Sequence, residues 1–198
     1  MSTHSVASTT VSTTVSSPRR ASALPPDERR AAIIEAVLPL FIEHGDRLTS
    51  RQIAEAAGVA EGTIFRAFAD KDELLSAVLE VVLDPEPFEQ ALAGIDPGLP
   101  FEQCLVAATE LIRKRVVDVW QIVSQLSGKL RQQASRPPTD SDELNAIFAA
   151  EPQRLRIEPS AAARLLRALT LSLSHPMLND EPVTADEIVD VLLNGVER

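Results

Sequence analysis

Cysteine, tyrosine and tryptophan are almost missing from this 198-residue chain, which contains one cysteine, one tryptophan and no tyrosine. The single cysteine, Cys104, excludes an intramolecular disulfide framework and a CxxC metal site. Such low cysteine usage is typical of the reducing cytoplasm, which is the location that we expect. Cys104 itself is predicted to be a small buried hydrophobic residue.

Long apolar runs are missing too, so the sequence offers no candidate for a membrane-spanning helix of about 18 or more residues. Residues 1–25 are rich in Ser and Thr and lack the basic and apolar regions of a signal peptide. Arg19 and Arg20 are followed by two prolines within six residues rather than by an apolar segment. We interpret residues 1–25 as a disordered tail, in which this arginine pair is either an inert charge or part of a flexible DNA-binding arm.

Helical periodicity is present along nearly all of the remaining chain, and strand-like alternation is not, so we predict an all-α fold. Asp27 is a candidate N-cap for the first helix, Pro39 should kink it, and Gly45 should end it. The segment Asp84-Pro85-Glu86-Pro87 interrupts the pattern. It divides the chain into a first domain at 26–84 and a second, helical domain at 85–198.

The second domain is expected to hold a short helix near 88–92, a long helical region from Phe101 to about Arg131, and helices near 142–150, 160–174 and 184–194. Thr184 and Glu187 form a capping box at the start of the last helix, and Gly195 should end it.

Two short helices joined by a glycine turn are predicted within the first domain. Thr49 and Gln52 match a capping box at the start of a helix over 50–57, and Gly58 begins the turn to a third helix over 61–68. Asp70-Lys71-Asp72-Glu73 resembles another capping box, before a fourth helix. Together with the first helix they form a helix-turn-helix unit, whose second short helix enters the major groove of DNA. Its core is expected to consist of Phe41, Leu48, Ile53, Ala57, Val59, Ile64 and Phe68.

The charges of the two predicted domains bear on whether this chain can bind DNA. Residues 19–84 carry eight basic and twelve acidic side chains, and residues 85–198 carry eleven and seventeen, for a net charge of −10. Because even the first domain is acidic overall, only the placement of a few basic residues can favour DNA. Acidity elsewhere should suppress nonspecific binding, which indicates a discriminating DNA-binding protein rather than a coating one.

The ordered set of motifs from residue 29 to 80 resembles the DNA-binding domain of the TetR family of bacterial transcriptional regulators. The matching segments are His44-Gly45, Thr49-Ser50-Arg51-Gln52-Ile53-Ala54, Gly58-Val59-Ala60-Glu61-Gly62-Thr63-Ile64-Phe65-Arg66-Ala67-Phe68 and Lys71-Asp72-Glu73-Leu74-Leu75. The resemblance implies a DNA-binding homodimer, usually a repressor released from a palindromic operator by a small molecule, with no cofactor, no metal and no membrane partner.

The resemblance also implies DNA contacts, which we carry over residue by residue. Thr49 caps its helix and touches the DNA backbone, and Arg51 reaches the edge of the groove. Thr63 and Arg66 face bases or phosphates from the recognition helix, and Lys71 grips a phosphate. Gly62 lies early in that helix, where glycine costs up to about 1 kcal/mol relative to alanine, a cost that close approach of a phosphate backbone would justify.

The sequence departs from the family pattern at two positions of the recognition helix. Phe65 stands where many members have tyrosine, so a hydroxyl contact to phosphate is lost. Ala67 stands where histidine or another polar residue is frequent. We therefore expect Arg66 to carry more of the base reading, as a bidentate contact to guanine.

An apolar ligand pocket and a dimer interface are expected in the second domain. Apolar spacing and the family plan place candidates for the pocket wall at Phe88, Phe101, Leu105, Leu111, Ile112, Val116, Trp120, Val123 and Phe148, with His175 as a polar candidate. Residues 160–174 and the last helix have apolar side chains on more than one face, which predicts a contribution to a symmetric dimer. The candidates are Leu165, Leu166, Leu169, Leu173, Ile188, Val191 and Leu192, although these side chains could also serve an internal core alone.

Other classes of function remain open at this stage. Cys104 with His175, or Glu43 with His44 and Asp46, could be imagined as catalytic or metal-binding groups, but neither set has a defining signature. We therefore predict no enzyme activity, no catalytic residues and no metal site. A further alternative is a DNA-binding dimer that responds to a protein partner or to no ligand at all.

Overall fold

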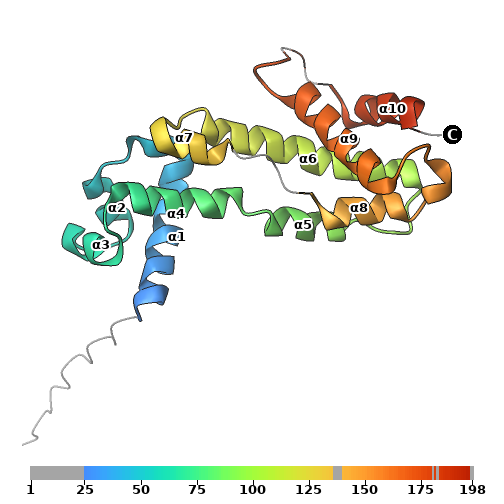
Figure 1. Cartoon of the computed structure of the whole chain (residues 1–198). Helices are drawn as coiled ribbons and strands as arrows, with labels where there is room; N and C mark the ends of the chain where they lie inside the picture. Colours follow the sequence, from blue (N-terminus) through green and yellow to red (C-terminus); the bar gives the residue numbers. More distant parts are fainter. Residues whose placement is uncertain (1–24, 136–139, 180, 182, 197–198) are drawn as a thin grey trace, which may run out of the picture.

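The computed structural model describes residues 25–135, 140–179, 181 and 183–196, and within these residues it contains helices and no strand. The predicted all-α class is confirmed. The chain forms an elongated molecule with a head at one end and a body at the other, and the long helix α6 runs along the body toward the head (Figure 1). The predicted tail, with Arg19 and Arg20, lies outside the described residues apart from Pro25.

The head consists of four α-helices and one short 3-10 helix, η1. They are α1 (Pro26–His44), η1 (Gly45–Arg47), α2 (Ser50–Ala56), α3 (Glu61–Ala67) and α4 (Lys71–Leu83). Their apolar faces converge on one core, which contains Ile33, Val37, Phe41, Leu48, Ile53, Ala54, Ile64, Phe68, Leu74, Leu75, Val78 and Leu79. Of the predicted core positions, Ala57 and Val59 are half-buried and pack against this cluster.

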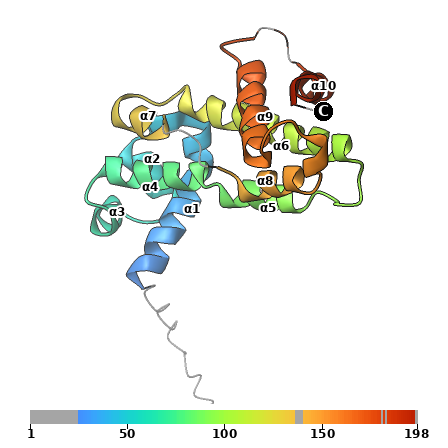
Figure 2. The ribbon, with the colours of Figure 1, turned by 45° about the vertical axis from the view of Figure 1, so that its right-hand side comes forward.

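The body contains the remaining helices. They are α5 (Glu86–Ala93), α6 (Phe101–Val123), α7 (Gly128–Ala134), α8 (Asp142–Ala149), the 3-10 helix η2 (Pro152–Arg154), α9 (Pro159–Ser174) and α10 (Ala185–Val196). The last two helices lie side by side against α6, as both ribbon views show (Figure 2). A second core fills the body, and no helix of the described chain is long and apolar enough to cross a membrane.

The head core takes three of its buried residues from beyond the Asp84-Pro85 break. Ile122 from α6, Leu126 from the following turn and Leu130 from α7 are all buried in it. The chain therefore returns to the head after building the first part of the body. The division at residue 84 remains a prediction about domains, but the head is not closed by residues 26–84 alone.

This return explains why the long helix predicted from Phe101 to about Arg131 is in fact two helices. The structure ends α6 at Val123 and begins α7 at Gly128, whose φ of 51° suits glycine. A straight helix could not bring Leu126 and Leu130 back onto the head. Burial of these two leucines is the physical reason for the break.

Three predictions about helix ends were wrong. The first helix starts at Pro26, with Pro25 in the cap position, so Asp27 lies in the first turn and makes no cap; proline suits this place because its missing amide has no helical partner there. Glu73 accepts from the Ala69 amide rather than from Asp70, so Asp70 caps α4 without a reciprocal box. The last helix continues through Gly195 to Val196.

Other end signals are confirmed. The Thr49–Gln52 and Thr184–Glu187 capping boxes both form. Gly45 follows α1 with a φ of 62°. Pro39 lies inside α1 and does not end it, and the expected kink there stays a prediction.

Candidate DNA-binding interface

The recognition unit is built from α2, a glycine turn and α3. Thr49 Oγ1 accepts from the Gln52 amide, and Gln52 Oε1 accepts from the Thr49 amide at 2.9 Å, so the start of α2 is fixed. Gly58 has a φ of 63°, and the Val59 amide donates to the Ala54 carbonyl, which closes the turn. Burial of Ile53, Ile64 and Phe68 then holds both helices on the head core.

The side chains predicted to touch DNA lie mostly on the open surface of this unit. Thr49, Arg51 and Arg66 are exposed, and Phe65 keeps 45% of its surface exposed. Thr63 is half-buried.

Gly62 is also on this surface. Apart from its chain neighbours and the backbone of its own helix, no atom of the described chain lies within 4 Å of the position that a Cβ atom would occupy there. Internal packing therefore gives no reason for glycine at this point of α3. Close approach by an external partner remains the interpretation that accounts for it.

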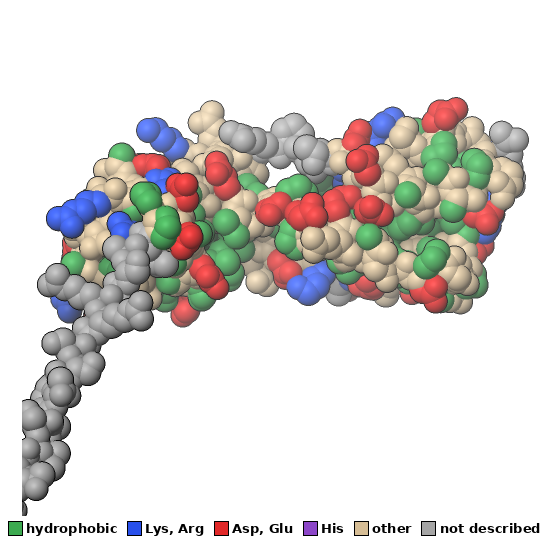
Figure 3. All heavy atoms as spheres, turned by 90° about the horizontal axis from the view of Figure 1, so that it is seen from below, with side chains coloured by type: hydrophobic (Ala, Val, Ile, Leu, Met, Phe, Trp, Pro, Cys, Tyr) green, Lys and Arg blue, Asp and Glu red, His purple; other side chains and the backbone are tan. Residues whose placement is uncertain are grey.

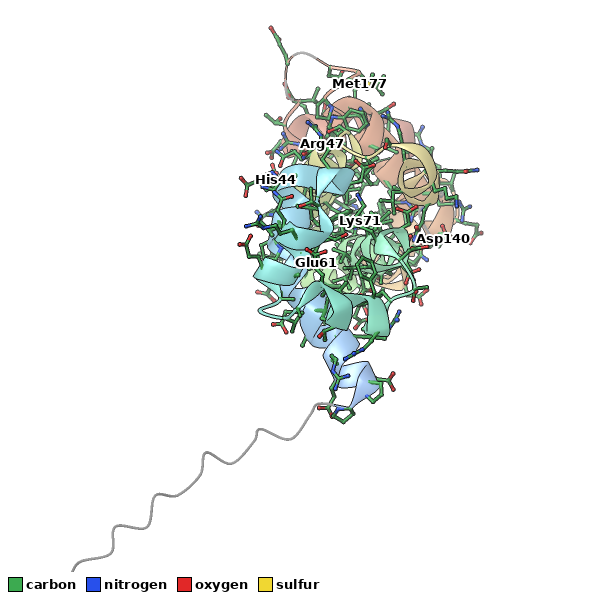
Figure 4. All side chains as sticks on the ribbon, turned by 90° about the vertical axis from the view of Figure 1, so that its left-hand side faces the viewer. His44, Arg47, Glu61, Lys71, Asp140 and Met177 are labelled. Carbon is green, nitrogen blue, oxygen red and sulfur yellow. The ribbon has the colours of Figure 1, made fainter. Side chains whose placement is uncertain are left out.

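Lys71, the predicted phosphate ligand, is half-buried at the start of α4. Its Nζ donates to the carbonyl oxygens of Leu48 and Asp46, at 3.0 and 3.3 Å. An ammonium group has three donors, so one remains for an anion. Figure 4, seen from the head end, shows Lys71 between Glu61 on one side and His44 and Arg47 on the other.

Several basic side chains lie at the head end of the molecule, among acidic ones. Figure 3 shows Lys and Arg side chains at the head end with Asp and Glu side chains among them, and a further row of Asp and Glu side chains across the middle of the molecule. Exposed basic residues near α2 and α3 include Arg47, Arg51 and Arg66. The recognition unit therefore offers a few exposed guanidinium groups to DNA, although the head as a whole is acidic.

Arg30 of α1 is a residue of this region that the sequence analysis missed. Its guanidinium donates to the Ala67 carbonyl at the end of α3 and to Glu73 Oε1 of α4 at 2.8 Å, and it lies 4.1 Å from the ring centroid of Phe68. The contacting residues lie 37 and 43 positions away along the chain. No local spacing signal could have found them.

The head and the body are joined by specific polar contacts. Asp46 Oδ2 accepts from the amide and the hydroxyl of Ser127, at 2.8 and 2.6 Å. Partial burial raises the pKa of Asp46, but these hydrogen bonds outweigh it and the pKa is lowered. On the other side of the head, Arg115 donates to the carbonyls of Leu83 and Asp84 at the end of α4.

Most of the residues predicted to line an apolar pocket lie in or against the body core. Phe101, Leu105, Ile112 and Phe148 are buried in the body core, and Phe88, Leu111 and Val116 pack against it. Val123 packs instead against the head core. The rings of Trp120 and His175 contact each other, with centroids 4.4 Å apart and planes inclined at 57°.

A surface groove of about 420 Å³ lies close to the Trp120 and His175 rings, between α6 and the end of α9. Its walls include Arg113, Val117 and Leu173. Two buried polar atoms of the groove residues, Arg113 Nε and Ser174 Oγ, have no hydrogen-bond partner.

The predicted dimer residues divide into two groups. Leu165 and Val191 are 45% and 55% exposed, and Leu169 and Leu173 are half-buried. Leu166, Ile188 and Leu192 are in the body core of the chain itself. Exposed Leu171 adds to the apolar surface of α9.

The sequence also offered two candidate catalytic or metal-binding sets, Cys104 with His175 and Glu43 with His44 and Asp46. Within the described residues, no group of three or more His, Cys, Asp and Glu side chains is placed to hold a metal ion. Cys104 is buried, and burial together with the Asp96 carboxylate raises the pKa of its thiol. A buried thiol with a raised pKa is a poor nucleophile.

Known proteins are similar to this chain in both sequence and fold. The model of bacterial regulatory proteins of the tetR family matches residues 33–78. An HTH-type transcriptional repressor of Mycobacterium tuberculosis, Rv3405c, is 30% identical over 173 residues, covering 82% of this chain and 84% of the relative. The regulator HbdR of an Aromatoleum species is 42% identical over 74 residues, covering 37% of this chain and 31% of the relative.

Solved structures agree in fold over most of the chain. A TetR/AcrR-family regulator from Thermobifida fusca superposes with a TM-score of 0.55 and 25% identity, covering 86% of this chain and all of that one. The SmeT–triclosan complex has a TM-score of 0.54 and 21% identity, covering 86% and 92%. The matched motif, the extended similarity to a repressor and the shared architecture establish that this chain belongs to the TetR family of bacterial transcriptional regulators.

Proposed function

We propose that this regulator is a repressor that binds a palindromic operator as a homodimer and reads it with α3. The observation that carries the proposal is the exposed surface of α3, where Arg66, Phe65 and Gly62 are open to a partner. Repressors are also among its relatives.

Arg66 is the base-reading residue in this proposal. It is exposed on a helix whose opposite face is fixed by Ile64 and Phe68 in the head core. A guanidinium can donate two parallel hydrogen bonds to guanine in the major groove. Arg51 and Lys71 supply contacts to the DNA backbone, which give affinity but little sequence information.

Dimerisation through α9 and α10 completes the reading unit. Leu165, Leu171 and Val191 leave large apolar surfaces open on these two helices, next to a body core that is already closed. A two-fold axis there would present two α3 helices to half-sites about 34–36 Å apart or a multiple of this distance. A palindromic operator follows from that symmetry.

Release by a small apolar molecule is the second part of the proposal. SmeT, which shares this fold, is known in complex with triclosan. A ligand changes DNA affinity only if it favours one arrangement of heads and body over another. The contacts of Asp46 with Ser127 and of Arg115 with the end of α4 are the links through which such a rearrangement would reach the head.

The first experiment is selection of bound duplexes from a random pool by the purified protein. An enriched palindrome supports the proposal, and the absence of enrichment with folded, dimeric protein contradicts it. On the selected site, Arg66→Ala should cost about 1–3 kcal/mol of binding free energy, with a smaller loss on random DNA. Arg156→Ala, an exposed arginine of the body between η2 and α9, is the matched control. Equal losses for Arg66→Ala on both DNAs would refute base reading.

Ligand release is tested with the same operator probe. A panel of apolar aromatic compounds, triclosan among them, is screened for stabilisation of the protein and then for loss of operator binding. A compound that does both supports release by a ligand. If none does, and an operator is nevertheless bound, the DNA-binding dimer without a small-molecule effector is the better description.

A further inference from the structure

The recognition helix depends on its C-terminal end for its position. It has only seven residues, and Ala60 at its N-terminus provides no side-chain cap. A helix this short is unstable alone, so tertiary contacts must hold it. Ile64 and Phe68 bury one face, but apolar contacts of this kind are not directional.

Directional contacts come from Arg30 and Glu73, which lie on the neighbouring helices α1 and α4. Arg30 donates to the Ala67 carbonyl in the last turn of α3, where carbonyl groups lack helical partners and a cation is favoured. Its second terminal nitrogen donates to Glu73 Oε1 at 2.8 Å. Glu73 Oε2 accepts from the amide of Ala69, two residues beyond α3, at 2.6 Å.

We propose that the Arg30–Glu73 pair is a positioning device that fixes the orientation of α3 and thereby sets the preference for the operator, without touching DNA. This proposal rests on the proposed reading of DNA by α3. The pair links three helices at one point and holds the backbone on both sides of Phe68. Base-reading groups must be held to within about half an ångström by such supporting contacts.

Stability is not the main contribution of this pair. The side chains of Arg30 and Glu73 are 35% and 41% exposed, and ion pairs in such places stabilise folded proteins little. The pair instead fixes the geometry of α3. The planar Arg30 guanidinium donates to a carbonyl and to a carboxylate at the same time, and it also stacks on Phe68. Lysine has the same charge but cannot reproduce this arrangement.

The sign of the charge at Glu73 makes the proposal sharply testable. Removing a carboxylate near bound DNA should strengthen binding to every sequence if only electrostatics act. If Glu73 positions α3, Glu73→Gln should instead weaken binding to the operator. Asp72→Asn is the matched control, because Asp72 is an exposed carboxylate in the same turn of α4.

The experiment measures dissociation constants of the full-length protein for the selected operator and for a scrambled duplex of the same length, over a series of salt concentrations. We expect Arg30→Lys and Glu73→Gln each to weaken operator binding about tenfold, the size of one impaired base contact. Neither should weaken binding to the scrambled duplex, and Arg30→Lys should leave the salt dependence unchanged. The double variant should lose little more than either single variant, because both remove one device.

Three results would overturn the proposal. Glu73→Gln could strengthen binding to both duplexes as Asp72→Asn does. Arg30→Ala could lower the salt slope by about one phosphate contact, which would make Arg30 a DNA ligand. Arg30→Lys and Glu73→Gln could leave the operator preference intact. If the wild-type protein prefers no duplex, the proposed function fails instead. Helical circular dichroism verifies that each variant is folded, and Glu73→Gln alone decides the question if the Arg30 variants are not.

Discussion

The turn between α6 and α7 lies against Gly45 at the end of α1. Replacing Gly45 by alanine adds one methyl group and so tests how close this contact between turn and head is. The backbone of Gly45 has φ 62° and ψ −136°, a conformation that residues with side chains rarely adopt. A Cβ atom at this position would lie 2.9 Å from Gln125 Cβ and 3.1 Å from the Gln125 carbonyl oxygen. Both distances are shorter than ordinary van der Waals contact, so the turn would have to shift.

The expected effect follows from two separate terms. Placing alanine in such a backbone conformation costs about 1–3 kcal/mol. Overpacking at a closed contact adds about 1–3 kcal/mol. Because relaxation of the turn reduces the second term, we expect Gly45→Ala to lower the free energy of unfolding by about 3 kcal/mol in total. Gly58→Ala is the control, since Gly58 has a similar φ of 63° but nothing within 4 Å of its Cβ position, and it should cost about 1–2 kcal/mol.

The assay is urea unfolding followed by circular dichroism, at one fixed protein concentration because dimerisation would contribute to stability. A markedly larger loss for Gly45→Ala than for Gly58→Ala supports the close contact between turn and head. Equal losses for the two variants would refute the reasoning, since only the backbone term would then be present.

The remaining predictions concern the dimer and the head–body contact. Leu165→Glu should convert the dimer to a monomer in light scattering while helicity is kept, because Leu165 is 45% exposed in the single chain; a dimer that persists would contradict the interface. Leu166→Ala should lower the free energy of unfolding by about 2–5 kcal/mol, since Leu166 is fully buried; a loss below about 1 kcal/mol would contradict its place in the core. For Asp46, the folded-state pKa is depressed, so its stabilising contribution is complete above the ordinary value of 3.8 and is lost as pH falls through the lowered value. The stability difference between wild type and Asp46→Asn should therefore shrink in acid, and a difference that grows there would refute the assignment.

Local patterns were sufficient for much of the head. The Thr49–Gln52 capping box, the glycine turn at Gly58 and the apolar spacing of α2 and α3 are short-range features, and the structure contains all of them. The exposure of Arg51 and Arg66 also follows from helical spacing, because the buried Ile53 and Ile64 take the core-facing side of α2 and α3.

Contacts between distant parts of the chain could not be predicted from local patterns. Glu73 was expected to complete a capping box with Asp70, but the Arg30 guanidinium and the Ala69 amide bind its carboxylate instead. Lys71 was expected to bind a phosphate, and no local pattern indicated that its ammonium group also donates to the carbonyls of Leu48 and Asp46. Both outcomes depend on which helices meet, which periodicity does not specify.

The sequence by itself determined the helical class, the recognition unit and the residues that this unit exposes, because spacing at 3.6 residues per turn and capping chemistry act within a few residues. Only the tertiary structure decided where α6 ends, which leucines are buried and which are left for a second chain, and how α3 is held at its end. Those features arise from contacts between segments tens of residues apart, such as Asp46 with Ser127 and Arg30 with Glu73. Their free energy exists only once the helices are packed.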